Sequence, residues 1–137
     1  MAHNILSRVL MPVMLNALVG VASINAHAGD PLEQMLPVST PTLSPGNVQA
    51  RTLNQQVHQP LFIVGDDALS HQWLAQKRDY LAKVNATGIV VNVRSKANWR
   101  QLKRYNLTLY PVQGDDFANA FEITHYPVFI EGNQVKQ

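Results

Sequence analysis

The chain has 137 residues, a formal net charge of +2 and no cysteine. This small charge gives no global attraction to nucleic acid or anionic lipid, and the lack of cysteine excludes disulfides and thiol chemistry. The length corresponds to a single domain once a targeting segment is set aside.

Residues 1–28 have the pattern of a secretory signal peptide. A short region with Arg8 precedes an apolar stretch at 9–24, and a cleavage signal of the Ala-x-Ala type ends at Ala28. The stretch is short for a bilayer span and is interrupted by Pro12, so we expect cleavage after Ala28 in preference to a membrane anchor. No later stretch is long and apolar enough to span a membrane, so the mature chain is expected to have no transmembrane anchor.

Residues 29–59 form a segment rich in proline and small polar residues. Prolines at 31, 37, 41 and 45 remove backbone donors and favour extended conformations. Residues 36–48 nevertheless alternate some apolar and polar positions. The sequence favours a flexible tether, and the alternative is an edge strand or an extended segment lying on a partner.

From residue 60 onwards, strand and helix patterns alternate, which predicts an α/β domain over 60–137 with a mostly parallel sheet. The last two strands are joined by a Gly-containing turn and predict a C-terminal antiparallel hairpin. Strands are expected at 60–64, 88–93, 107–112, 127–130 and 134–136, and helices at 67–84, 96–105 and around 117–121. The strand at 107–112 is expected at an edge because Pro111 lacks a backbone donor.

Two Gly-Asp-Asp turns, at 65–67 and 114–116, each follow a predicted strand and precede a predicted helix. A carboxylate at this place caps free N–H groups and complements the helix dipole, so helix capping is the first interpretation. The alternative is a metal-assisted hydrolase site, because the ends of parallel strands share one edge of a sheet. That site would use His125 together with Asp66, Asp67, Asp115 and Asp116.

The stretch Tyr126-Pro127 directly precedes a predicted strand, and an aromatic residue before proline favours a cis peptide bond in a tight loop. The neighbouring His125 can titrate near neutral pH, although a single histidine beside a turn is usually structural or solvated.

A basic run at 94–104 contains five positive charges and no acidic residue. Lys96, Arg100 and Lys103 fall on one helical face, with Trp99 and Tyr105 interleaved. A solvated face or a docking patch for an acidic partner is the favoured interpretation. A platform for single-stranded nucleic acid is the alternative.

The segment 117–135 resembles the end of a thioredoxin-like domain, in which a short helix, a cis-proline loop, a strand, a Gly-containing turn and a second strand follow in this order. The resemblance places Pro127 at the cis-proline and Asp67-Ala-Leu-Ser70 at the redox Cys-x-x-Cys. Both cysteines are absent, so thiol redox activity is excluded. The chain ends where the last helix of that fold would begin, so the resemblance implies a truncated thioredoxin-like domain.

A second resemblance covers nearly the whole chain after the signal peptide. The stretches "LPVSTPTLSPG", "PLFIVGDDALSHQWLAQKRDYL", "GIVVNV", "LYPVQGDDFANAF" and "THYPVFIEGNQVKQ" are similar to a family of exported proteins encoded in integrating conjugative elements. This resemblance implies a periplasmic accessory of a conjugative type IV secretion apparatus, without enzymatic activity or cofactor, that contacts other secretion proteins of the cell envelope.

The two resemblances together predict a non-catalytic interaction module. A cis-proline loop leaves backbone groups open to an extended partner peptide, so we expect partners at the edge that carried the redox motif. The residues expected there are Asp67, Ser70, His71, His125, Tyr126 and Pro127. The metal-assisted hydrolase is the alternative function, and we expect no nucleic-acid partner.

Overall fold

The computed structural model describes residues 29–137, so the predicted signal peptide at 1–28 lies outside the described residues. Leu32–Gln137 form one compact unit. Within the described residues, no helix is both long and apolar enough to cross a membrane.

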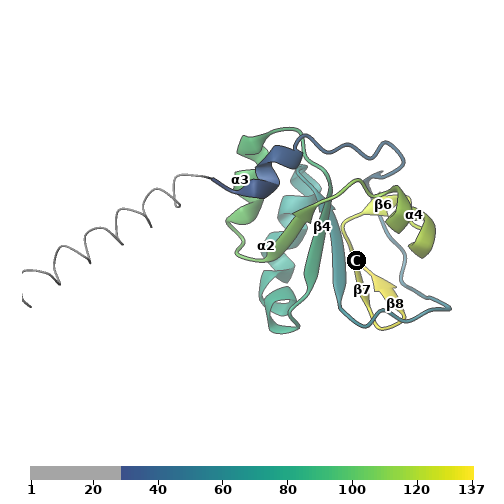
Figure 1. Ribbon diagram of the computed structural model, residues 1–137. Coiled ribbons are helices and arrows are strands. Elements are labelled where there is room, and N and C mark those ends of the chain that lie inside the picture. Colours follow the sequence, from purple (N-terminus) through teal and green to yellow (C-terminus); the bar gives the residue numbers. More distant parts are fainter. Residues whose placement is uncertain (1–28) are drawn as a thin grey trace, which may run out of the picture. The chain divides into compact units, whose positions relative to one another are not determined.

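The elements of this unit agree closely with the pattern expected from residue 60 onwards (Figure 1). Before that point the structure has three short elements: the 3₁₀ helix η1 (Pro31–Met35) and the strands β1 (Ser44–Pro45) and β2 (Arg51–Thr52). The later strands are β3 (Leu61–Gly65), β4 (Thr87–Asn92), β5 (Thr108–Pro111), β6 (His125–Tyr126), β7 (Val128–Glu131) and β8 (Gln134–Lys136). The helices are α2 (Ala68–Lys83), α3 (Lys96–Lys103) and α4 (Asp115–Phe121).

Within residues 29–137, the main sheet has six strands in the order β2-β8-β7-β3-β4-β5. The strand β5 lies at an edge, and β7 and β8 form the C-terminal antiparallel hairpin, both as predicted. The pairs β3–β4 and β4–β5 are parallel, whereas β3–β7, β7–β8 and β2–β8 are antiparallel. The α/β class is therefore confirmed, but the prediction of a mostly parallel sheet is wrong because the sheet is mixed.

The length of α4 explains this difference. Parallel neighbours require a crossover that returns the chain to the opposite end of the sheet. The seven residues of α4 extend only about 10 Å at 1.5 Å per residue. The chain therefore re-enters the sheet near the end that it left, with Val128 opposite Ile63 and Ile130 opposite Leu61. The strand β7 consequently runs against β3.

Successive residues of the central strands point to opposite faces, and this alternation builds two hydrophobic layers. Phe62, Val64 and Val90 pack with α2 and α3 on one face. Ile63, Ile89 and Val91 pack with α4 and with Leu43 of the proline-rich segment on the other face. Gly88 makes room for Phe62, since a Cβ at this position would lie 2.3 Å from the phenylalanine ring.

The proline-rich segment is mostly extended, the alternative to a flexible tether for 29–59, although it lies on the chain's own sheet. Leu32, Leu36 and Val38 pack against the first hydrophobic layer, and Val48, Leu53 and Val57 pack against the second. Val38 and Val93 exchange backbone hydrogen bonds of 3.0 Å, β1 pairs in parallel with β6, and β2 pairs with β8. Leu43 is buried. These residues belong to the same compact unit as the sheet.

Candidate functional site

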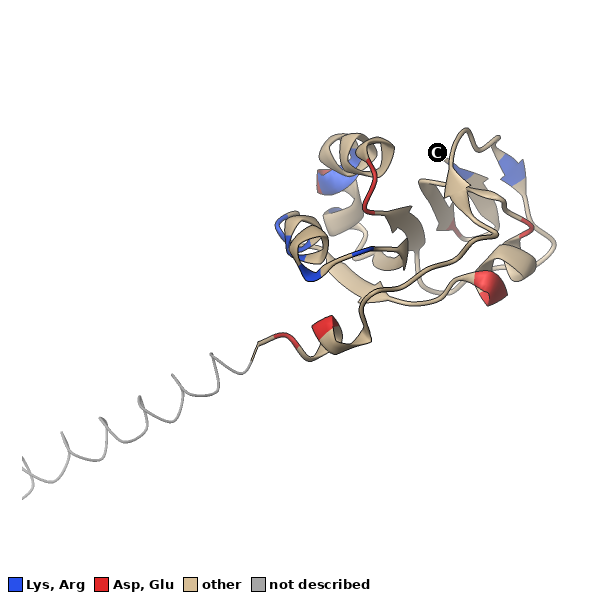
Figure 2. Cartoon of the chain, turned by 90° about the horizontal axis from the view of Figure 1, so that it is seen from above, with Lys and Arg blue, Asp and Glu red and all other residues tan. Residues whose placement is uncertain are grey.

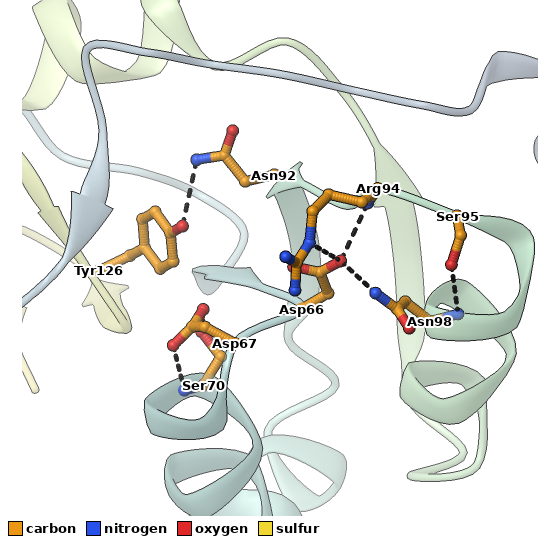
Figure 3. A network of polar contacts seen from close by, with 8 residues as sticks. All are labelled: Asp66, Asp67, Ser70, Asn92, Arg94, Ser95, Asn98 and Tyr126. Carbon is orange, nitrogen blue, oxygen red and sulfur yellow. Dashed lines mark hydrogen bonds and ion pairs between the residues drawn. The ribbon is translucent and has the colours of Figure 1, made fainter.

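Polar side chains gather where β3 and β4 end, at the edge that the sequence indicated for partner binding (Figure 3). We call Asp66, Asp67, Ser70, Asn92 and Tyr126 the strand-end cluster. They come from the β3–α2 turn, the first turn of α2, the end of β4 and the strand β6. The carboxyl ends of adjacent parallel strands share one edge of the sheet, which places the first four residues together.

Asp67 caps α2. Its Oδ2 accepts a hydrogen bond from Ser70 N at 2.9 Å, and its Oδ1 accepts one from Ser70 Oγ at 2.8 Å. The buried Ser70 hydroxyl also accepts a hydrogen bond from Gly65 N at 2.9 Å. The first Gly-Asp-Asp turn is therefore a helix-capping turn, as predicted. The Ser70 hydroxyl stabilises it by accepting the hydrogen bond from the backbone of Gly65.

Asp66 joins the end of β3 to the start of α3. Its Oδ2 accepts hydrogen bonds from Arg94 N at 2.9 Å and from Asn98 Nδ2 at 2.8 Å, and Arg94 Nε lies 3.5 Å away. Only 7% of the Asp66 side chain is exposed. A buried carboxylate with this many donors is well compensated, so Asp66 has a structural role.

The second Gly-Asp-Asp turn differs from the first. Gly114 is the N-cap of α4 and has no side chain to cap it, while Gln113 Oε1 accepts a hydrogen bond from Asp115 N at 3.1 Å. Asp115 and Asp116 both lie in its first turn, where negative charge complements the helix dipole. Asp115 accepts a hydrogen bond from Thr42 Oγ1, and the hydrogen bonds with Thr42 and Gln113 lower the pKa of this carboxyl. The prediction of a carboxylate cap is therefore wrong for this copy, but the predicted favourable charge at the start of the helix is present.

The two turns do not form a common site. In the part of the chain that the structure describes, no three His, Asp or Glu side chains are grouped so that they could hold a metal ion. Asp66 and Asp67 are engaged at the β3–α2 turn, and Asp115 is engaged with Thr42. The divided site that the hydrolase alternative requires is not assembled by these residues.

Tyr126 lies in the interior with only 2% of its surface exposed. Its hydroxyl oxygen accepts a hydrogen bond from Asn92 Nδ2 at 3.1 Å, and its ring lies against Gly65, where an added Cβ would be 2.8 Å away. The Tyr126–Pro127 peptide bond is cis, as predicted, and Leu36–Pro37 is a second cis bond.

The chain itself occupies the backbone groups of the loop before Pro127. Ser44 N donates to Thr124 O at 3.1 Å, and Gly46 N donates to Tyr126 O at 3.0 Å. A partner peptide that paired with this loop would therefore have to displace residues 44–46.

Asn92 holds the same segment against the sheet. Its Oδ1 accepts a hydrogen bond from Thr40 N at 2.6 Å, and its Nδ2 donates to Leu43 O at 3.1 Å. The buried Thr40 hydroxyl donates to Val91 O at 2.8 Å and accepts from Gly114 N at 2.9 Å. Sequence reasoning missed both residues. The available signal was Asn92 as the one polar residue of the predicted strand at 88–93, because a polar side chain in a largely buried strand requires partners.

The two histidines expected at this edge have other neighbours. His71 Nδ1 lies 2.8 Å from Tyr105 Oη, and His125 Nδ1 lies 3.2 Å from Ser44 Oγ. The structure thus brings Asp67, Ser70 and Tyr126 together, while the side chains of His71 and His125 are engaged elsewhere.

The basic run at 94–104 has several of its charges compensated. Arg100 donates to both carboxylate oxygens of Glu33, at 2.7 and 3.1 Å, and Arg94 pairs with Asp66. Lys103 Nζ lies 5.8 Å from the centre of the Trp99 ring, and Trp99 is fully buried. Figure 2 shows Lys and Arg along α3 and on α2. A nucleic-acid base can stack only on an exposed aromatic ring, so the buried Trp99 ring cannot provide the stacking surface that the nucleic-acid alternative requires of it.

Burial gives Tyr126 a testable pH dependence. It raises the pKa of the phenol above its ordinary value of 10.0, the Asn92 hydrogen bond opposes this change, and the charges of Asp67 and Asp66 add to it. The unfolded chain therefore loses this proton first, and binds fewer protons than the folded chain once the pH exceeds the ordinary value. We expect the free energy of unfolding to fall as the pH rises above about 10, and to fall less steeply in Tyr126→Phe.

Urea denaturation between about pH 8 and about pH 11 measures this effect. Tyr110→Phe is the matched control, because Tyr110 is 44% exposed. We expect this control to keep the slope of the unaltered protein. An equal slope in Tyr126→Phe would show that Tyr126 does not carry the effect.

Fold and site together define an α/β protein with a mixed sheet, whose strand-end polar groups bind one another and the chain's own extended segment. The chain belongs to the family described as "Protein of unknown function (DUF2859)", which matches residues 19–135. No curated protein and no solved structure matches it.

Proposed function

We propose that the protein is a non-catalytic, thioredoxin-like interaction module that is exported to the periplasm. In this proposal it acts in the assembly or function of the conjugative type IV secretion apparatus of an integrating conjugative element, through contacts with other secretion proteins. The conjugative assignment is supported by the sequence resemblance across the chain after residue 28. The thioredoxin-like assignment is supported by the succession of α4, cis-Pro127, β7, a turn at Gly132 and β8.

One observation carries the non-catalytic part of the proposal. The place of the redox motif, Asp67 to Ser70, is a capping turn in which the Asp67 carboxylate and the Ser70 hydroxyl bind each other and the turn's backbone. A nucleophile or a general base has to reach a substrate, and these groups are used within the turn. The site therefore stabilises the fold.

Deletion of the gene from a conjugative element tests the proposal, with transfer frequency as the measurement. We expect transfer to be abolished or strongly reduced and to be restored by the unaltered gene. The double variant His71→Gln/His125→Gln should restore it equally well, because a non-catalytic module does not need a titrating histidine. Normal transfer after deletion would contradict the conjugative role, and failure of the double variant despite normal accumulation and normal partner capture would contradict the non-catalytic role.

A further inference from the structure

A groove runs between one face of α2 and the β7–β8 hairpin, away from the strand-end cluster. It consists of two adjoining hollows that share Trp73, Lys77 and Gln137. The first hollow has a volume of about 130 Å³ and is also lined by Tyr80, Leu81 and Phe129. The second has a volume of about 250 Å³ and reaches Leu69 and Pro127. We call the two hollows the α2 groove.

Trp73, which lines the α2 groove, has a hydrogen-bond donor without an acceptor among the described residues. The indole Nε1 of Trp73 is buried and has no partner, and among the described residues it is the one buried side-chain nitrogen or oxygen in that condition. Trp73 is only 6% exposed and lines both hollows. Buried polar groups are almost always paired, so an unpaired donor on a residue that lines a hollow is a position where a ligand could supply the acceptor.

The rim of the groove is apolar along one ridge of α2. Leu69, Trp73 and Tyr80 recur at helical spacing and therefore lie on one face of the helix, with the polar Gln76 between Trp73 and Tyr80. Leu69 is 39% exposed and Tyr80 is 42% exposed, and both are among the large hydrophobic side chains that the described residues leave in contact with solvent. From Leu69 to Tyr80 the ridge extends about 16 Å, which corresponds to three turns of a helix.

The charge beside the groove is positive. Lys77 and Lys136 line the first hollow. The nearby Glu131 is already engaged, since it accepts a hydrogen bond from Tyr80 Oη at 2.8 Å and lies 3.7 Å from Lys136 Nζ. Lys77 has no ion-pair partner within residues 29–137. A partner carboxylate at this rim could therefore form an ion pair with Lys77.

We propose that the α2 groove binds an acidic amphipathic helix of a partner protein, an inference that rests on the proposed function as an interaction module. One apolar side chain of the partner enters the first hollow, which is slightly smaller than an engineered cavity of roughly 150 Å³ that holds benzene. A carboxylate or amide oxygen beside it accepts the hydrogen bond from Trp73 Nε1, and another carboxylate pairs with Lys77. The remaining apolar residues of the partner pack along the ridge between Leu69 and Tyr80.

Two synthetic peptide probes test this assignment with the full chain. Both have the same leucines at i, i+3, i+4 and i+7, and both are stapled so that their helicity is equal. One has glutamate and the other has lysine at the flanking positions. Binding of the fluorescently labelled peptides is followed by anisotropy. We expect the acidic peptide to bind roughly tenfold more tightly than the basic one.

Two protein variants and one control locate the bound peptide. We expect Lys77→Glu to weaken binding of the acidic peptide by roughly tenfold, and Trp73→Phe, which keeps an apolar ring but removes the donor, to weaken it by a factor of several. Lys96→Glu makes the same change of charge on α3, outside the groove, and is expected to leave the affinity unchanged. Thermal melting confirms that each variant is folded.

Equal affinity for the two peptides, no saturable binding, or an equal effect of Lys96→Glu and Lys77→Glu would overturn the proposal. These outcomes are separate from the test of the proposed function. If deletion impairs transfer while the acidic peptide fails to bind, the conjugative role stands and the groove assignment falls. If the acidic peptide binds as expected while deletion leaves transfer unchanged, the groove assignment stands and the conjugative role falls.

Discussion

Asn92→Ala is expected to lower the free energy of unfolding by about 3 kcal/mol, since it removes several hydrogen bonds and leaves buried partners unsatisfied. Asn92 accepts from Thr40 N and donates to Leu43 O and to Tyr126 Oη. Without it, residues 38–46 lose a principal connection to β4. Such a loss is a large part of the typical stability of a small domain, about 5–15 kcal/mol. The midpoint of urea denaturation measures the change.

Two further variants separate this role from other effects of the substitution. Asn47→Ala changes an exposed asparagine of the same segment and is expected to alter stability by less than about 0.5 kcal/mol. Asn92→Asp keeps an acceptor for Thr40 N but removes the donors to Leu43 and Tyr126, so it should destabilise the protein as Asn92→Ala does. Hydrogen exchange at Ser44 N and Gly46 N should accelerate in both Asn92 variants. Unchanged exchange and an unchanged midpoint in Asn92→Ala would mean that Asn92 does not hold the segment.

Tyr126→Ala is expected to destabilise the protein by about 3–5 kcal/mol, which is typical when a large buried aromatic side chain is truncated. The ring packs with Ile63, Val91 and Val128 in the second hydrophobic layer, and its hydroxyl is bonded to Asn92. Tyr126 is therefore part of the core, although its place beside the cis-proline first indicated a partner contact. Thermal and urea unfolding measure the loss.

The comparison with Tyr126→Phe distinguishes packing from hydrogen bonding. The phenylalanine variant keeps the ring and loses only the hydroxyl, so we expect a loss of about 1 kcal/mol. In a transfer assay, Tyr126→Phe should support normal transfer, while Tyr126→Ala should fail because less folded protein accumulates. Transfer that is lost in Tyr126→Phe at normal accumulation would instead show that the hydroxyl contacts a partner.

The proposed interaction surface differs from the one that the sequence indicated. The strand-end edge is occupied by Thr40 to Gly46, which use the backbone of Thr124 and Tyr126 and the side chain of Asn92. The α2 groove, by contrast, has an unpaired donor at Trp73, two lysines and an exposed apolar ridge. A partner can therefore bind beside α2 without displacing any part of the chain.

Local patterns in the sequence were sufficient to predict the helices and most strands. The strand β3 and the helix α2 agree with the ranges predicted from the apolar run before Gly65 and the helical spacing after it. The cap by Asp67 and the cis bond at Pro127 were also predictable, because each depends on the residue type and its immediate neighbours. These features are determined by contacts a few residues apart.

Tertiary structure alone decided the direction of β7, the path of residues 38–57 and the partners of Asn92. Thr40 and Asn92 are 52 positions apart, and Ser44 and His125 are 81 apart. No local period reports such pairs, because each hydrogen bond depends on where a distant segment packs. The sequence by itself therefore determined which elements form and excluded thiol chemistry. The fold decided that residues 40–46 cover the strand-end edge and that the groove beside Trp73 is open. Burial and hydrogen-bond pairing depend on how distant segments pack, so the sequence alone does not report them.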